Sequence, residues 1–181
     1  DEYRLAIRDE LIQLKEEEKF IALAACLGLE FEVSILASAI GIDKLECLET
    51  LQLLEKKTSF ICDIIEKDDV YGFTSSFTLE TIRQELHLSQ DGPKGLVRQI
   101  VREYHARIAT VLEKSKTTAQ ELRIAHHYYA AGRNYAEAAI RYLLVAANHC
   151  AEIFRFREAR SFLQQASEVG SFINNLEPYK L

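Results

Sequence analysis

The sequence has no methionine and no tryptophan, and it has only two prolines among its 181 residues. Methionine is missing even at the first position, so we expect a fragment of a longer polypeptide, although processing of the start would leave the same pattern. A run of about 18 apolar residues is also missing, and residues 1–4 lack the basic-then-apolar pattern of a signal peptide. No membrane span and no secretion signal are therefore predicted.

Cysteine is scarce and scattered. The four cysteines lie far apart and form no C-x-x-C pair: Cys26, Cys47, Cys62 and Cys150. This spacing gives neither a disulfide framework nor a zinc knuckle. A reducing, cytoplasmic location is expected.

The residues that are present favour a folded chain with two differently charged halves. Hydrophobic residues make up 48% of the sequence, enough for one or two compact cores. Residues 1–92 contain 20 acidic and 9 basic residues, a net charge of −11, whereas residues 93–181 contain 8 acidic and 13 basic residues, a net charge of +5. The halves are expected to face each other or different partners, because surface charge steers association. Two solvated faces without a function explain the split equally well.

A domain junction is predicted where the charge changes sign. The segment Leu88-Ser89-Gln90-Asp91-Gly92-Pro93 gathers turn-forming residues, and Pro93 disfavours helix at the residue before it. We therefore predict two domains, residues 1–92 and 93–181.

The first domain is predicted to contain three helices followed by a β-ribbon. Acidic residues 16–18 precede an apolar helix that ends at Gly28, a second helix spans about 32–40, and Asp43 with Glu46 forms a capping box for a third. The third helix is expected to bury a leucine stripe that Leu53 widens: Leu45, Leu48, Leu51 and Leu54. Strands are predicted at 59–65 and 70–74, joined by a turn at 66–69. Three helices and a β-hairpin wing describe a winged-helix domain.

The second domain is predicted to be helical throughout. Apolar residues recur every three or four positions from residue 97 to 111, and further helices are expected at about 118–131, 134–152 and 155–169. Capping boxes are predicted at Thr118 and Asn134, and Gly132 is a predicted C-cap. Ala125 and Ala159 stand 34 residues apart, which is the tetratricopeptide period. The predicted fold class is therefore mainly α, a winged-helix domain followed by a tetratricopeptide-like region.

Several segments together resemble one protein family. They are LAACLGLEF at 23–31, ILA at 35–37, IG at 40–41, YGF at 71–73, YHARIA at 104–109 and AHHYYAAG at 125–132. In this order they are similar to the winged-helix and following helical signatures of STAND-type signalling ATPases, an AAA/NACHT-like family. The resemblance covers nearly the whole chain. It implies that the winged helix packs on an ATPase core as a relay, and that the helical repeats sense an inducer or hold a partner.

The sequence departs from this family at one position. Members often have a histidine two residues after the phenylalanine of the second wing strand, close to bound nucleotide, whereas this chain has Ser75. A hydroxyl donates hydrogen bonds to phosphate, so Ser75 is the candidate nucleotide-facing position, with Ser76 beside it. A serine pair between a strand and a helix is more often a helix cap.

Motifs for catalysis and cofactor binding are missing. The seven glycines form neither G-x-x-x-x-G-K-[ST] nor G-x-G-x-x-G, so no cofactor, no phosphate-binding loop and no nucleotide hydrolysis are expected of this chain. Four metal-ligating side chains fall on neighbouring predicted helices: His126, His127, His149 and Cys150. Their spacing matches no zinc pattern, so no metal site is predicted and helix packing is the favoured interpretation. His105 lacks a specified partner for general-base catalysis, and a packed or capping role is favoured.

DNA binding is the alternative function. Winged helices often read the major groove with the third helix, which here spans about 43–57. That helix carries four acidic residues against three lysines, so repulsion by phosphate disfavours DNA. Basic residues gather instead in the second domain. There, Arg155, Arg157 and Arg160 form a candidate surface for an acidic protein partner, and nucleic acid is the other ligand that such arginines suit.

We therefore predict a non-catalytic regulatory and protein-interaction region of a larger multidomain signalling ATPase. It would relay the binding of a partner or inducer to a nucleotide-binding core. The expected partners are another protein or other domains of the same polypeptide, with nucleic acid disfavoured and no membrane. The alternative is the winged-helix DNA-binding region of a transcriptional regulator.

Overall fold

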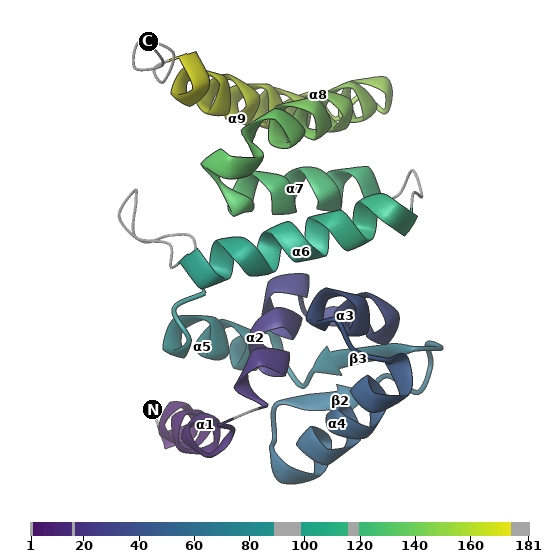
Figure 1. Cartoon of the computed structure of the whole chain (residues 1–181), viewed down its shortest axis with the longest axis vertical. Coiled ribbons are helices and arrows are strands. Elements are labelled where there is room, and N and C mark those ends of the chain that lie inside the picture. The colour runs from purple at the N-terminus through teal and green to yellow at the C-terminus, as the bar shows by residue number, and fades with distance from the viewer. Residues whose placement is uncertain (1, 16, 89–98, 116–119, 175–181) are drawn as a thin grey trace. The chain divides into compact units, whose positions relative to one another are not determined.

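A computed structural model describes residues 2–15, 17–88, 99–115 and 120–174. The protein is mainly helical, as predicted, and divides into two compact units, residues 1–98 and 99–181 (Figure 1). The predicted junction between residues 92 and 93 falls in the segment 89–98, which lies outside the described residues.

The first unit alternates helices with short strands. Its elements are α1 (Glu2–Gln13), α2 (Glu18–Leu27), β1 (Glu30–Glu32), α3 (Val33–Ile40), α4 (Lys44–Lys57), β2 (Ile61–Asp63), β3 (Val70–Phe73) and α5 (Ser76–Glu85). The three predicted helices correspond to α2, α3 and α4, and the two predicted strands correspond to β2 and β3. Sequence patterns did not predict α1 or β1, and α5 was anticipated only through the serine pair at 75–76, read as a helix cap.

The three strands form one antiparallel sheet in the order β1-β3-β2. Phe31 of β1 lies opposite Tyr71 of β3, so the ribbon expected to have two strands has a third. Glycine suits position 72 of the central strand, because a Cβ there would lie 3.1 Å from Ile64 Cδ1 and 3.2 Å from the backbone oxygen of Leu29. These are tight contacts, so a larger residue would require both neighbouring segments to shift slightly away from β3.

Helix α4 shows which leucines face the core of this unit. Leu51 and Leu54 are fully buried, as predicted. Leu45 and Leu53 are 63% and 44% exposed, so the predicted stripe is wrong at these two positions, and Cys47 is buried instead. A strict spacing of three rotates about 60° per step around a helix. The buried positions 47, 51 and 54 follow the helical period and stay on one face.

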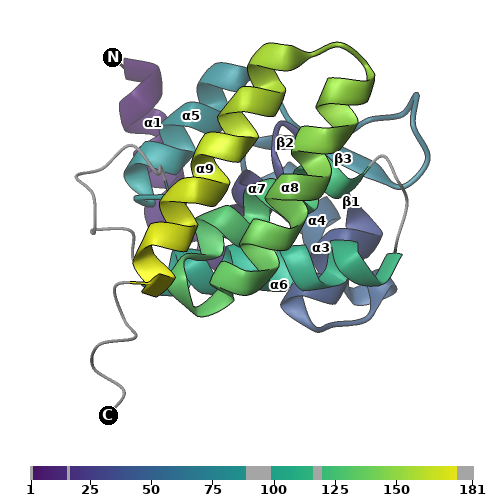
Figure 2. The same cartoon turned by 90° about the horizontal axis from the view of Figure 1, so that it is seen from above.

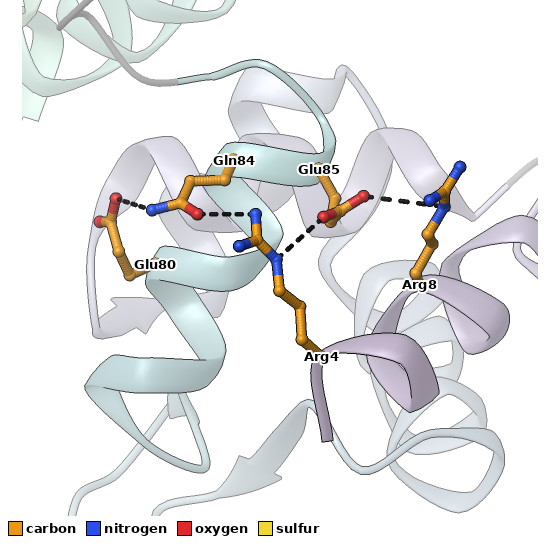
Figure 3. A network of polar contacts seen from close by, with 5 residues as sticks. All are labelled: Arg4, Arg8, Glu80, Gln84 and Glu85. Carbon is orange, nitrogen blue, oxygen red and sulfur yellow. Dashed lines mark hydrogen bonds and ion pairs between the residues drawn. The ribbon is translucent and has the colours of Figure 1, made fainter. Parts of the chain in front are cut away.

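Helix α1 is joined to α5 by a network of polar contacts (Figure 3). Arg4 lies 3.3 Å from a Glu85 oxygen and donates to Gln84 Oε1 at 2.9 Å, while Arg8 lies 3.9 Å from the other Glu85 oxygen. Gln84 donates in turn to Glu80 at 3.3 Å. Exposed pairs of this kind contribute little stability. Burial of the apolar face of α1 contributes more, and the polar network fixes its position along α5.

The second unit is a series of helices, each packed on the one before. Its described elements are α6 (Gln99–Ser115), α7 (Glu121–Ala131), the short 3-10 helix η2 (Arg133–Tyr135), α8 (Ala136–Glu152) and α9 (Phe156–Asn174). Helix α6 packs on α7, α7 on α8, and α8 on α9; Figure 2 shows α8 and α9 side by side. Buried alanines allow close contact between these helices: Ala106, Ala109, Ala125, Ala139, Ala146 and Ala147.

Helix ends follow some of the predicted caps. Asp43 caps α4 by accepting from the Leu45 N–H at 2.8 Å, and Gly132 ends α7 with φ 81°. The prediction that Asn134 caps α8 is wrong. Residues 133–135 form η2, and the residue that precedes α8 is Tyr135. Thr118, the predicted cap of the preceding helix, lies outside the described residues.

Candidate functional site

The three arginines predicted to bind a partner lie together at the start of α9. Arg155 is in the turn before the helix, Arg157 and Arg160 are in its first turns, and all three are exposed. Arg155 donates to Glu158 Oε1 from Nε at 3.0 Å and from Nη2 at 2.8 Å. Arg157 and Arg160 make no ion pair with any other residue that the structure describes. Their charges are therefore available to a ligand.

The turn that positions these arginines has an unusual backbone. Phe154 adopts φ 61°, with its N–H donating to Ala151 O at 3.1 Å, and the Arg155 N–H donates to Cys150 O at 2.8 Å. This is the Schellman pattern, in which glycine normally takes the left-handed position. A phenylalanine there costs about 1 kcal/mol or more. The turn therefore holds its aromatic residue against the local backbone preference.

Two exposed phenylalanines alternate with the arginines along the chain, and sequence patterns did not identify them. Phe154 is 79% exposed and Phe156 is 63% exposed, with ring centroids 6.1 Å apart. Exposed Ile153 precedes them in the same turn. The alternation of apolar residues and arginines at 153–157 could have indicated this exposed cluster. The predicted helix began at about residue 155, however, so no turn was expected there. Aromatic and arginine side chains are the types enriched in protein interfaces.

Ser75, the other predicted site residue, is the N-cap of α5. Its Oγ accepts from the Thr78 N–H at 3.0 Å and lies 2.9 Å from Thr78 Oγ1. The cap is thus observed, and contact with a nucleotide phosphate stays a prediction. Ser75 belongs to the first unit and the arginines to the second.

Replacing Ser75 by alanine is expected to lower the free energy of unfolding by about 1 kcal/mol, because the Thr78 N–H loses its acceptor. Urea unfolding followed by circular dichroism measures the change. Ser76→Ala is the matched control, since Ser76 is exposed in the first turn of α5, where alanine is tolerated. Equal stability of the two variants would contradict the cap.

A pair of buried histidines joins α6 to α7. His105 Nδ1 and His127 Nδ1 are 2.8 Å apart, which is a hydrogen bond, and both side chains are buried. Burial above all, then the neighbouring His105, His126 and Arg123, lowers the pKa of His127 to about 2. His127 is therefore neutral at physiological pH. Across the described ranges, no group of three histidine, cysteine, aspartate or glutamate side chains is arranged to hold a metal ion.

A second polar cluster connects three helices through Glu113 of α6. The hydroxyls of Tyr128 and Tyr142 donate to its two oxygens at 2.5 and 2.8 Å, and Arg141 Nη2 lies 3.3 Å from it. Burial, together with the hydrogen bond to Glu113, raises the pKa of Tyr128 to about 12. Tyr128 is therefore a hydrogen-bond donor at neutral pH, and the cluster fixes α7 and α8 against α6.

None of the family models, curated proteins and solved structures with which the chain was compared matches it. Among the described residues, no helix combines the length and apolar character that a membrane span requires.

Proposed function

We propose that this chain is a non-catalytic regulatory and protein-interaction region of a STAND-type signalling ATPase, which relays the binding of a partner or inducer to a nucleotide-binding core. The observation that carries the proposal is the exposed arginine and aromatic cluster at residues 153–160, in a unit that has no cofactor motif in its sequence. Such a cluster suits recognition of another protein.

The order of elements in the first unit supports a winged helix. Helices α2, α3 and α4 are followed by the hairpin of β2 and β3. Strand β1, which lies between α2 and α3 in the chain, pairs with β3 and completes the sheet. In this interpretation α4 is the third helix and residues 64–69 are the tip of the wing. The unit would serve as the relay to the nucleotide-binding core.

The packing of the second unit supports a tetratricopeptide-like region. Ala125 of α7 and Ala159 of α9, 34 residues apart, are both buried against neighbouring helices. Each is followed three residues later by an aromatic side chain, the buried Tyr128 and the half-buried Phe162. Two helical hairpins, α6 with α7 and α8 with α9, then correspond to successive repeats.

The alternative is DNA binding by the winged helix, and the surface of α4 argues against it. Its exposed charged residues include Glu46 and Glu49, while Lys44 is paired with Asp69 at 2.8 Å and Lys57 with Glu17 at 3.0 Å. A helix that enters the major groove needs free basic side chains to replace counterions. The acidic surface of α4 suits a protein neighbour better.

An electrophoretic mobility assay separates the two functions. The purified chain is expected not to retard a duplex DNA at physiological salt, because the α4 surface repels phosphate. A Glu46→Lys/Glu49→Lys variant, which reverses charge on the same exposed helix, is the control and is expected to gain DNA binding at low salt. Retardation by the unaltered chain with a steep salt dependence would overturn the proposed function.

A further inference from the structure

Exposed apolar side chains continue from the turn onto one face of α9. Phe156 and Leu163 are seven residues apart and therefore lie on the same side of the helix, with Arg160 between them. Leu163 is 51% exposed, and Ala159 and Ala166 take the buried side toward α8. We call Phe154, Phe156, Arg157, Arg160 and Leu163 the α9 surface.

Two features of the α9 surface favour a ligand: a strained backbone conformation at Phe154 and large apolar side chains exposed to solvent. Phe154 occupies a left-handed position that glycine adopts without strain, yet its ring is largely exposed and gains little burial in return. Three large apolar side chains are also left in solvent around two unpaired arginines among the described residues. Strain and exposure in one place point to binding.

We infer that the α9 surface binds an amphipathic helix of a protein partner that carries acidic side chains beside its apolar stripe. This inference rests on the proposed protein-interaction function and names the partner's chemistry.

The charge of the partner follows from the position of Arg160. Any ligand that covers Phe156 and Leu163 also covers Arg160, because the three side chains lie along one face of α9. A buried arginine without a counter-charge is strongly unfavourable, whereas a carboxylate accepts two parallel hydrogen bonds from it. Arg157, which is also unpaired within the described ranges, offers a second site for a carboxylate at the rim.

The shape of the partner follows from the packing of the second unit. Helices α7, α8 and α9 are each packed on the preceding helix, so the outer side of α9 presents to solvent the kind of surface on which a further helix packs. Side chains at spacings of four and seven along α9 form the ridge that such a helix would meet. Phe154 extends this ridge past the end of the helix.

Fluorescence anisotropy with the full chain tests the inference. The probe is a labelled synthetic helical peptide of about five turns, with leucine at spacings of three, four and seven and glutamate beside the stripe. Its twin has lysine in place of every glutamate. We expect saturable binding of the glutamate peptide and binding at least about tenfold weaker for the lysine peptide.

Variants assign the binding to the α9 surface. Arg160→Ala and Phe156→Ser are each expected to weaken binding of the glutamate peptide by about tenfold or more. Leu5→Ser is the matched control, because Leu5 is 59% exposed on α1 in the other unit, and it should leave binding unchanged. Phe154→Gly should weaken binding while raising the melting temperature by about 2–4 °C, because glycine relieves the strained backbone.

Three outcomes would overturn the inference: no binding of the glutamate peptide, equal binding of both peptides, or Arg160-dependent binding to phosphatidylserine vesicles without binding to the peptide. The DNA assay keeps the two proposals separate. Loss of peptide binding without DNA retardation removes the α9 inference alone. DNA retardation that persists in Arg160→Ala removes the proposed function and leaves the peptide result to stand by itself.

Discussion

Replacing Leu51 by aspartate is expected to unfold the first unit, with a loss of more than about 4 kcal/mol in the free energy of unfolding. Leu51 is fully buried in the core that α4 forms with neighbouring elements. The substitution removes its apolar burial and places a carboxylate among buried hydrophobic side chains. The lost burial and the cost of an unpaired buried charge act in the same direction.

Leu53→Asp is the matched control for this experiment. Leu53 lies two residues further along the same helix and is 44% exposed, so its aspartate stays in water and is expected to change stability by less than about 1 kcal/mol. Arg157→Ala, in the other unit, should leave folding intact. Urea unfolding gives the free energies, and hydrogen exchange of the α4 amides locates the loss. Equal stability of Leu51→Asp and Leu53→Asp would contradict the assignment of the buried face.

The apolar pattern of α4 predicted the helix correctly but predicted its buried face only in part. The stripe predicted a helix and two of its core residues, because apolar spacing reports a helical face. It failed at Leu45 and Leu53, where apolar side chains outnumber the positions that neighbouring elements cover. The side of α4 that is buried is determined by its packing against the sheet and α3. The sequence of α4 alone does not contain that information.

The elements that were not predicted share a physical cause. Strand β1 is three residues long, too short for an alternating pattern, and it forms because β3 offers it a free edge. Helix α1 finds its partners on α5 about 80 residues away, through Arg4 and Glu85. Contacts of such range are set by tertiary packing and leave little local signal.

The candidate sites were predicted unevenly for similar reasons. The exposed arginines follow from a local run of charge, and the structure leaves Arg157 and Arg160 on the surface. The left-handed turn at Phe154 could not be predicted, because the glycine that usually marks such a position in the sequence is replaced by phenylalanine. The partner of His127 is His105, 22 residues earlier, and only the packing of α6 on α7 identifies this pair. Sequence reasoning assigned both histidines to packing roles but did not bring them together.

Acid is expected to destabilise the second unit through His127. The hydrogen bond between the two Nδ1 atoms requires one donor and one acceptor, so a proton added to the accepting nitrogen turns the bond into a repulsion. The folded pKa of His127 is lowered to about 2, against 6.5 for the unperturbed side chain. Between these values the unfolded chain binds a proton that the folded chain does not. The contribution of His127 is therefore complete above pH 6.5 and is lost as pH falls below it, at about 1.4 kcal/mol per pH unit.

Comparing stability at pH 7 and pH 5 measures the effect of histidine protonation, because most carboxylates stay ionised over that interval, and the variants assign it to His127. From pH 6.5 to 5 the expected loss attributable to His127 is about 2 kcal/mol, and His127→Gln should abolish it, since the amide bonds to His105 but takes up no proton. His126→Gln is the matched control: His126 is adjacent and exposed, so its variant should keep most of the pH dependence. Hydrogen exchange of α6 and α7 amides, corrected for the intrinsic rate, assigns the change to this helix pair. A pH dependence that persists in His127→Gln would show that the buried pair stays closed in acid and that other groups govern the transition.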